Sequence, residues 1–277
     1  MTNLAKYGPW ALIIGGSEGV GASFARKLAA DGFKLVLVAR KLEPLQQLSE
    51  ELTAVGAEVR IASVDLAKHD ALDQVREVTD DIEVGMLIYN AGANNVRGNF
   101  VELDPKIYRS VIAINVIGQS EFARHYGGLM RQRGRGGIIL TGSLSGYMGS
   151  ASLAAYTGAK AFSRVFTEAL WAECAPMGID VLHLNIGFTA TPAMARLGID
   201  LSGATAPEAV AQEGLDNISN GPIWVAGGEE NWERARQRSV VDGRADALRA
   251  FATPARESIG PSATAARRDD PAQAGSQ

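Results

Sequence analysis

The chain has 277 residues, 46% of them hydrophobic and 21% charged, and its formal net charge is −4. This length and composition fit one large α/β domain, and a negative charge without a basic stripe argues against nucleic-acid binding. The single cysteine, Cys174, excludes an internal disulfide and suits the reducing cytoplasm; in its helical context it is expected to be a packed residue. The scattered histidines predict no metal site, and the short N-terminal apolar run predicts neither a signal peptide nor a membrane span.

The first apolar run, residues 10–14, predicts a buried strand of a parallel sheet, and a glycine-rich loop follows it. Residues 22–31 then show helical periodicity. In this strand–loop–helix context, glycines let the backbone approach a pyrophosphate, and the helix N-terminus supplies free N–H groups and a positive dipole end. The loop therefore predicts a dinucleotide site formed by Gly15, Ser17, Glu18, Gly19, Val20 and Gly21.

The second predicted strand, residues 34–39, ends where this kind of fold selects its cofactor. An acidic residue there would bind the ribose 2′-hydroxyl of NAD, but the chain has Ala39, Arg40 and Lys41. Two cations and no carboxylate favour the 2′-phosphate of NADP over NAD. The alternative is that Arg40 and Lys41 are the solvated start of a helix. Glu18 opposes NADP, because a carboxylate in the glycine loop would repel an adjacent phosphate.

Residues 42–55 predict an amphipathic helix, and residues 58–64 predict the third strand, which closes with Asp65 and Leu66. A carboxylate at the C-terminal end of a strand lies where the ligands of open α/β sheets bind. Asp65 is therefore predicted to hold an adenine amino group, with a helix N-cap as an equally good alternative. Leu66, the next residue, is also predicted to contact the cofactor.

After a helix at residues 68–81, the fourth strand, residues 85–89, ends in Asn90, Ala91 and Gly92. The small size of these residues lets the chain pass close to the cofactor. They are therefore added to the predicted cofactor site.

A long helix is predicted at residues 105–124, with Asn115 in its middle, and the fifth strand at residues 136–141. Asparagine is unfavourable inside a helix and needs a reason to be there. It either bonds a neighbouring strand end or holds a water beside a catalytic lysine.

Ser143, Tyr156 and Lys160 follow the fifth strand, and Tyr156 and Lys160 are four residues apart. If a helix begins near residue 155, these two side chains lie on one face. A fixed cation lowers the pKa of a neighbouring phenol from its usual value of about 10. Ser143 can then hold a carbonyl or hydroxyl oxygen while Tyr156 gives or takes its proton.

The helix at residues 156–172 and the sixth strand at 179–185 are followed by a stretch that closes over the expected nicotinamide position. Cofactor contacts are predicted there at Gly187, Thr189 and Thr191. An apolar substrate wall is predicted from Leu144, Tyr147, Met148, Phe188, Met194 and Leu197. Ordinary core packing is an equally good interpretation of each of these wall residues.

The rest of the chain predicts a helix at residues 207–218, a last strand at 222–226 and a charged helix at 231–251. From about residue 253 the chain loses large apolar residues and is expected to be disordered or loosely docked. Alternating strands and helices predict a doubly wound parallel sheet in a single domain, residues 1–252, with a tail at 253–277.

The chain resembles the classical short-chain dehydrogenase/reductase family over roughly residues 8–226. The resemblance implies a Rossmann-type fold, NAD(P) binding and oxidoreductase activity. Four landmarks coincide in order and spacing: the loop of Gly15, Gly19 and Gly21; Asn90-Ala91-Gly92; Asn115; and Ser143 with Tyr156 and Lys160.

The resemblance also implies the roles of the catalytic residues. Tyr156 is the general acid and base, Lys160 lowers its pKa and binds the nicotinamide ribose, and Ser143 orients the substrate oxygen. Asn115 completes the tetrad through a proton-relay water.

Thr191 and the backbone near Thr189 hold the nicotinamide carboxamide by the same resemblance. The chain also departs from the family pattern. Ile14 stands where a threonine usually opens the glycine motif, and Ile186 replaces the proline that usually follows the sixth strand. Glu18 stands where NADP-using members often have a basic residue.

These features predict an NADP-dependent oxidoreductase that interconverts a small-molecule ketone and a secondary alcohol, with Tyr156 handling the proton on oxygen. The segment after the last strand resembles members that act on larger apolar substrates. The alternatives are an NAD-dependent alcohol dehydrogenase of the same fold, and a non-catalytic protein that senses cofactor or serves as a structural subunit. The family expectation is a homodimer or homotetramer through the helices of Asn115 and Tyr156.

Overall fold

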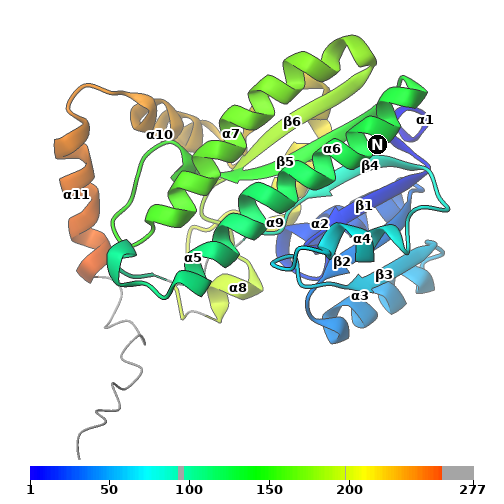
Figure 1. The fold of residues 1–277 in the computed structure, drawn as a ribbon, viewed down its shortest axis with the longest axis horizontal. Coiled ribbons are helices and arrows are strands. Elements are labelled where there is room, and N and C mark those ends of the chain that lie inside the picture. The colour runs from blue at the N-terminus through cyan, green and yellow to red at the C-terminus, as the bar shows by residue number, and fades with distance from the viewer. Residues whose placement is uncertain (93–96, 197, 258–277) are drawn as a thin grey trace, which may run out of the picture.

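The computed structural model describes residues 1–92, 97–196 and 198–257, without the side chains of residues 251–257. Its centre is a parallel sheet with the strand order β3-β2-β1-β4-β5-β6-β7 (Figure 1). The strands are β1 (Trp10–Ile14), β2 (Lys34–Ala39), β3 (Val59–Ser63), β4 (Val84–Tyr89), β5 (Gly136–Ser143), β6 (Ile179–Ile186) and β7 (Ile223–Val225). The predicted doubly wound parallel sheet is confirmed.

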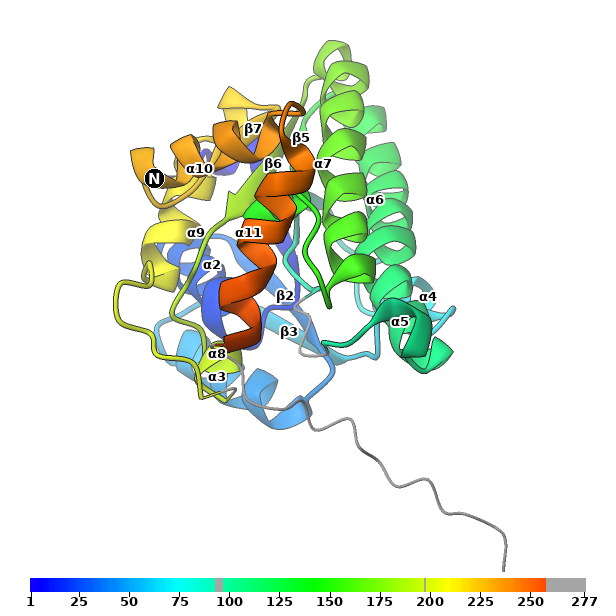
Figure 2. The same ribbon diagram turned by 90° about the vertical axis from the view of Figure 1, so that its left-hand side faces the viewer.

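Helices cover both faces of the sheet, as the two ribbon views show (Figures 1 and 2). One face is covered by α2 (Gly19–Ala30), α3 (Leu42–Ala54) and α9 (Pro207–Asp216). The other is covered by α4 (Ala71–Arg76), α6 (Gln119–Arg133) and α7 (Ala154–Cys174). The remaining helices are α1 (Leu4–Tyr7), α5 (Pro105–Ile112), α8 (Pro192–Ala195), α10 (Glu229–Ser239) and α11 (Arg244–Glu257).

The side chains of β1 alternate between the two cores. Ala11 and Ile13 join the core under α2, whereas Leu12 and Ile14 join the core under α6. A strand that is buried on both faces needs apolar residues throughout, which explains the uninterrupted apolar run at this position. Each fully buried large side chain of this kind stabilises the fold by about 1.5–3 kcal/mol.

The strand order reverses between β1 and β4. The chain moves outward from β1 to β2 and β3, and then returns to place β4 on the other side of β1. In open α/β sheets, ligands bind in the crevice outside the carboxyl ends of the strands at such a point. The glycine loop after β1 and Asn90-Ala91-Gly92 after β4 meet there.

The structure corrects two predicted helices. The segment at residues 231–251 forms α10 and α11 instead of one helix, because Val240 is extended and Gly243 has a left-handed backbone with φ 68°. The helix predicted at 68–81 is reduced to α4, since the chain beyond it forms tighter turns. The N–H of Val78, for example, donates to the carbonyl of Val75 at 3.1 Å.

Helix α11 lies on the side of the molecule that faces the viewer in Figure 2. It runs past residue 252, the predicted end of the domain, to Glu257. The rest of the predicted tail lies outside the described residues. Within the part of the chain that the structure describes, no helix is both long enough and apolar enough to cross a lipid bilayer.

Candidate active site

The glycine loop and the end of β4 are held together by close backbone contacts. Gly15 has φ 83°, and a Cβ atom on it would lie 2.8 Å from the backbone nitrogen of Ala91. A Cβ atom on Gly21 would lie only 2.0 Å from the carbonyl oxygen of Gly15. The side-chain amide of Asn90 donates to that same carbonyl at 3.1 Å. Only glycine fits at Gly15 and Gly21 without moving the loop.

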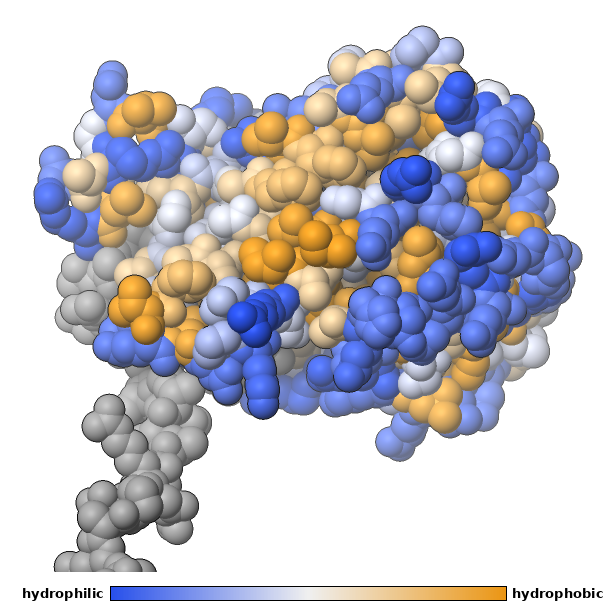
Figure 3. All heavy atoms as spheres, in the orientation of Figure 1, coloured by the Kyte–Doolittle hydropathy of each residue, from blue (hydrophilic) through white to orange (hydrophobic). Residues whose placement is uncertain are grey.

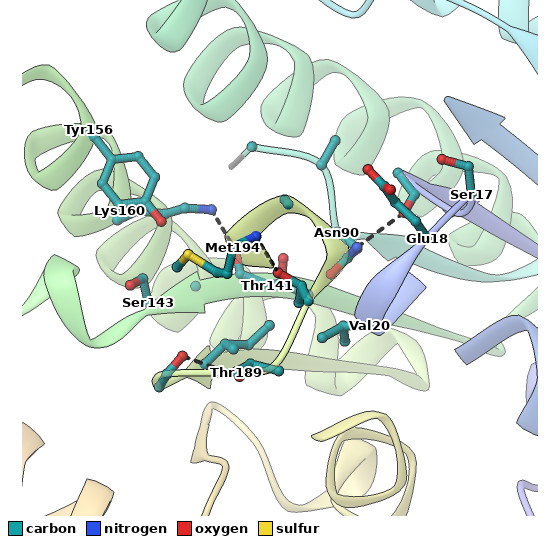
Figure 4. A pocket seen from close by; sticks show the side chains of 18 residues that line it. Ser17, Glu18, Val20, Asn90, Thr141, Ser143, Tyr156, Lys160, Thr189 and Met194 are labelled. Atoms are coloured by element: carbon teal, nitrogen blue, oxygen red, sulfur yellow. Dashed lines mark hydrogen bonds between the residues drawn. The ribbon is translucent and has the colours of Figure 1, made fainter. Parts of the chain in front are cut away.

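A cavity of about 290 Å³, called the loop cavity below, lies beside the glycine loop (Figure 4). The predicted cofactor residues that line it are Gly15, Ser17, Glu18, Val20, Asn90, Ala91, Gly92, Gly187, Thr189 and Thr191. The predicted catalytic residues that line it are Ser143, Tyr156 and Lys160. The sequence reasoning missed Thr141, Gly142, Ile186 and Ala193, although the first three belong to strand ends that it placed at this edge.

The N-terminus of α2 fits a negatively charged cofactor. The Glu18 side chain does not cap this helix. It accepts two hydrogen bonds from Arg196 instead, at 2.8 and 2.5 Å. The first N–H groups of α2, including that of Gly19, therefore stay available to a phosphate at the positive end of the helix dipole. This end of the loop cavity thus suits a phosphate group of a dinucleotide.

The ion pair with Arg196 also reduces the electrostatic repulsion expected between the Glu18 carboxylate and a phosphate of NADP. The Arg196 guanidinium lowers the pKa of the Glu18 carboxyl, and Lys41 makes a smaller contribution in the same direction. Glu18 is therefore ionised, but its charge is offset by a bidentate cation. Its repulsion of a nearby phosphate is correspondingly weaker than the sequence suggested.

The other predicted cofactor residues do not line the loop cavity. Arg40 and Lys41 are exposed between β2 and α3. Asp65 accepts a hydrogen bond from the N–H of Ala67 at 3.1 Å, which is an Asx-turn, and Leu66 packs against the core under α6. Gly19 and Gly21 lie in the first turn of α2 and are not among the residues that line the loop cavity. The cofactor roles of these residues remain predictions.

Ser143, Tyr156 and Lys160 converge at the end of β5 (Figure 4). Ser143 ends the strand, and its Oγ accepts a hydrogen bond from the N–H of Ser145 at 3.1 Å. Tyr156 lies in the first turn of α7, and Lys160 lies one turn later on the same face. The Nζ of Lys160 lies 5.8 Å from the Tyr156 ring centre and donates to the carbonyl oxygen of Thr141 at 3.1 Å. The predicted helical placement of the pair is thus observed.

The pKa of Tyr156 is shifted upward, whereas the sequence analysis expected a downward shift. Burial raises the pKa of the phenol above its ordinary value, and a hydrogen bond with Ser143 opposes this rise. Lys160 is itself buried, which lowers its pKa to about 8. At neutral pH the tyrosine is therefore protonated and most of the lysine is charged. This is the state in which a phenol can donate a proton to a carbonyl oxygen.

A neutral histidine lies beside Lys160. His183 on β6 contacts the Oγ of Ser163 at 3.2 Å and the amide of Asn185 at 3.0 Å. Burial and the cations of Lys160 and Arg164 lower the pKa of His183 to about 3, so it adds no charge beside Lys160 at neutral pH. Among the residues that the structure describes, no three His, Cys, Asp or Glu side chains form a group suited to a metal ion.

Asn115 lies in a π-helical turn, Ala113–Gly118, which divides the helix predicted at 105–124 into α5 and α6. Its side-chain amide donates a hydrogen bond to the carbonyl oxygen of Val111 at 3.0 Å. The asparagine therefore supplies a hydrogen-bond donor to a backbone carbonyl next to the irregular turn. A Cβ atom on Gly92 would lie 2.1 Å from the Oδ1 of Asn115. This buried oxygen has no hydrogen-bond partner in the described part of the chain. It suits the relay role that the resemblance implies, which remains a prediction.

A second cavity of about 280 Å³, called the arginine cavity below, shares Ser143 and Tyr156 with the loop cavity. The predicted substrate-wall residues that line it are Leu144, Phe188 and Met194. The lining residues that the sequence reasoning did not assign to the site are Arg97, Ser145, Leu153, Ile186, Ala193, Arg234 and Arg238.

Two predicted wall residues lie elsewhere. The Tyr147 ring centre lies 4.9 Å from the guanidinium carbon of Arg164, and Tyr147 and Met148 line a separate cavity that reaches Leu248 of α11. Leu197 lies outside the described residues.

The family model of the short chain dehydrogenases matches residues 9–201. This match contains the glycine loop and the Ser143, Tyr156 and Lys160 arrangement. The chain belongs to the short-chain dehydrogenase family. It is an oxidoreductase that acts on CH–OH and C=O groups.

Two relatives with different names show which proteins this short-chain dehydrogenase is similar to. It is 31% identical over 242 residues to a 7beta-hydroxysteroid dehydrogenase of Clostridium sardiniense, covering 86% of this chain and 92% of that protein. It is 35% identical over 204 residues to a very-long-chain 3-oxoacyl-CoA reductase of Neurospora crassa, covering 71% of this chain and 61% of that protein.

Solved structures of short-chain dehydrogenases share its fold. A 7beta-hydroxysteroid dehydrogenase structure matches with a TM-score of 0.84 and 27% identity, covering 91% of this chain and 99% of that one. A short-chain dehydrogenase from Sphingobium yanoikuyae in complex with NADPH matches with a TM-score of 0.73 and 27% identity, covering 96% of this chain and 98% of that one.

Proposed function

We propose that this short-chain dehydrogenase interconverts a bulky, largely apolar ketone and its secondary alcohol, using NADP(H) in preference to NAD(H). The observation that carries the proposal is the convergence of Ser143, Tyr156 and Lys160 on the cavity beside the glycine loop. Of these three residues, Ser143 and Tyr156 also line the arginine cavity, which supports a reacting oxygen bound where the two cavities meet.

The residues of the chain have distinct roles in this reaction. A bound nicotinamide cofactor supplies or accepts the hydride. In the reductive direction Tyr156 donates its phenolic proton to the carbonyl oxygen, and Ser143 donates a hydrogen bond that stabilises the charge developing there. Lys160, held by the carbonyl of Thr141, provides the cation that stabilises the phenolate left behind. In the oxidative direction the phenolate takes the alcohol proton.

A bulky substrate is supported by the apolar part of the arginine cavity and by two kinds of relatives. Leu144, Leu153, Phe188 and Met194 line the cavity beside Ser143. The relatives named 7beta-hydroxysteroid dehydrogenase and very-long-chain 3-oxoacyl-CoA reductase bear names that refer to molecules with a large apolar part, a steroid skeleton and a very long acyl chain.

The preference for NADP is supported by the charge around the end of β2. Arg40 and Lys41 are exposed there, and Lys41 acts on the carboxyl of Glu18, which lines the loop cavity. The related structure from Sphingobium yanoikuyae contains NADPH. A guanidinium and an ammonium beside the ribose favour a 2′-phosphate through charge-assisted hydrogen bonds.

Turnover of a panel of ketones, from small to steroid-sized, with NADPH and NADH tests the function and the cofactor preference together. We expect the largest ketones to be reduced fastest and NADPH to be preferred.

Arg40→Ala and Lys41→Ala should each lower kcat/KM for NADPH about 10- to 100-fold, with a much smaller effect on NADH, because each removes a charged partner of the phosphate. Lys106→Ala, which removes an exposed cation on α5, is the matched control. An unaltered preference in the Arg40 and Lys41 variants would contradict the NADP assignment.

We also propose a homodimer or homotetramer built on α7, which carries Tyr156, and on the helical segment from α5 to α6, which carries Asn115. Exposed apolar side chains gather on these helices and their neighbours, as the space-filling view shows (Figure 3). They include Ile112, Ile117, Phe162 and Val165, and the Phe162 and Phe166 rings stack 5.4 Å apart. Contiguous apolar surface of this kind is typical of protein interfaces. The mass of the protein in solution distinguishes an oligomer from a monomer.

The cytoplasmic location is part of the same proposal. Its support is that Cys174 is the single cysteine of the chain, so that no internal disulfide can form, which suits a reducing compartment. Fractionation of cells that produce the protein is the measurement that checks this.

A further inference from the structure

The arginine cavity carries positive charge in a chain that is negative as a whole. Among the described residues that line it, the charged ones are Arg97, Arg234 and Arg238, and none is acidic. The formal net charge of the chain is −4. A concave site lined by one sign of charge raises the local concentration of ligands of the opposite sign.

Two of these arginines are held on one helix. Arg234 and Arg238 are four residues apart on α10 and therefore share a face. The guanidinium of Arg238 donates to the carbonyl of Leu144 at 3.2 Å, which ties α10 to the residue next to Ser143. Burial, and then the cation of Arg234, lower the pKa of Arg238. The two cations therefore repel each other, and an anion bound by both would relieve this repulsion.

The guanidinium groups of Arg234 and Arg97 keep most of their charge available to a ligand. Arg234 pairs with Glu230 at 2.5 Å, but the two side chains are 46% and 78% exposed, and ion pairs this exposed are weak. Arg97, which comes from the segment after β4, forms no hydrogen bond or ion pair with another residue in the described ranges.

The rest of the cavity wall is mostly apolar. Leu144, Leu153, Phe188 and Met194 line it together with the arginines and the reactive Ser143 and Tyr156. A ligand that fills the cavity therefore meets hydrogen-bonding groups at its reacting oxygen, apolar side chains along its body and guanidinium groups at a further point. Planar guanidinium groups match carboxylate and phosphate oxygens in geometry as well as in charge.

We propose that the arginine cavity binds an oxyanion, a carboxylate or a phosphate, carried by an apolar substrate whose reacting carbon lies at Ser143 and Tyr156. Arg234 and Arg238 bind this oxyanion, and Arg97 adds to the positive field. The inference rests on the proposed ketone–alcohol function and specifies its substrate class: an anionic ketone or alcohol in preference to a neutral one of the same size.

Two matched pairs of substrates test the inference with NADPH as cofactor. The first pair is a 7-oxosteroid with a side-chain carboxylate and its methyl ester. The second is a 3-oxoacyl-CoA and the ethyl ester of the same 3-oxo acid. For the wild type, kcat/KM should be at least about 10-fold higher for the anionic member of one pair, mainly through KM. A preference in the steroid pair identifies a carboxylate as the anion, and a preference in the CoA pair identifies a phosphate.

Substitutions on α10 then assign the preference to its residues. Arg234→Gln and Arg238→Gln should each reduce the anionic-to-neutral ratio of kcat/KM about 10-fold or more, and Arg238→Lys should restore part of it. The control is Arg236→Gln on the same helix, because Arg236 pairs with Glu229 and Glu233 and does not line the cavity. A purely structural role of Arg238 would lower turnover of both members of a pair and leave their ratio unchanged.

The outcomes separate this inference from the proposed function. If both esters are reduced in a Tyr156-dependent way but neither pair shows a preference for its anionic member, the function stands and the inference is wrong. If no probe is reduced, the proposed function fails, and calorimetric titration of the NADPH-bound protein with the acid and the ester of the steroid decides the inference. Equal affinities in that titration overturn it, and tighter binding of the acid that Arg234→Gln weakens supports it.

Discussion

Tyr156→Phe should lower kcat for ketone reduction about 100- to 10,000-fold, because the variant has no proton to give to the carbonyl oxygen. The ring stays in place, since phenylalanine fills nearly the same volume on the first turn of α7. Ser143 still offers one hydrogen bond to the substrate oxygen, so some electrostatic stabilisation survives. NADPH affinity should change little, because Lys160 and the glycine loop remain intact. Steady-state kinetics and a fluorescence titration with NADPH measure the two effects.

Tyr147→Phe is the matched control for this variant. Tyr147 is a nearby tyrosine, but the structure places it beside Arg164, where it lines neither the loop cavity nor the arginine cavity. Its phenylalanine variant should keep kcat close to that of the wild type. Equal losses of kcat in the two variants would show that Tyr156 has no special role, and would remove the basis of the proposed mechanism.

Gly21→Ala should disrupt the glycine loop. Its Cβ atom would lie 2.0 Å from the carbonyl oxygen of Gly15, a backbone atom that cannot turn aside. Overpacking of this kind costs about 1–3 kcal/mol, which for a chain of this size lowers Tm by about 2–4 °C per kcal/mol. The shift of Gly15 also moves the backbone that lines the loop cavity, so NADPH affinity should fall with stability. Thermal unfolding with and without NADPH measures both quantities.

Gly128→Ala is the control for Gly21→Ala. It shows the general effect of replacing a helical glycine without the clash between a Cβ atom and the carbonyl oxygen of Gly15. Gly128 lies in α6, and no atom lies within 4 Å of a Cβ built on it. Alanine there should stabilise the protein by about 0.5–1 kcal/mol through helix propensity alone. If Gly21→Ala is as stable as Gly128→Ala and binds NADPH normally, the close packing of the loop is not what positions the cofactor.

The backbone of the site could be predicted because its signals are local. A buried run followed by glycines defines the loop after β1, and the i, i+4 spacing of Tyr156 and Lys160 places them on one helical face. The parallel sheet then brings strand ends from distant parts of the sequence to one edge. These local rules are enough to bring most of the predicted cofactor residues to the loop cavity.

The residues that the sequence could not place depend on packing between distant segments. Arg234 and Arg238 reach the cavity because α10, which ends at Ser239, docks against Leu144. The direction of the Tyr156 pKa also depends on packing, since burial raises this pKa more than the hydrogen bond with Ser143 lowers it. Similarly, the repulsive effect of Glu18 is weakened by Arg196, which is 178 residues away in the sequence.

The most direct test of the account is the transfer of deuterium from NADPH labelled at the reactive carbon of the nicotinamide to a 7-oxosteroid. Mass spectrometry and NMR of the isolated product locate the label. We expect a secondary alcohol with one deuterium on the former carbonyl carbon, formed by the wild type and almost absent with Tyr156→Phe. An alcohol without deuterium at that carbon, or no alcohol from any ketone of the panel, would contradict the assignment of this chain as a ketone-reducing dehydrogenase.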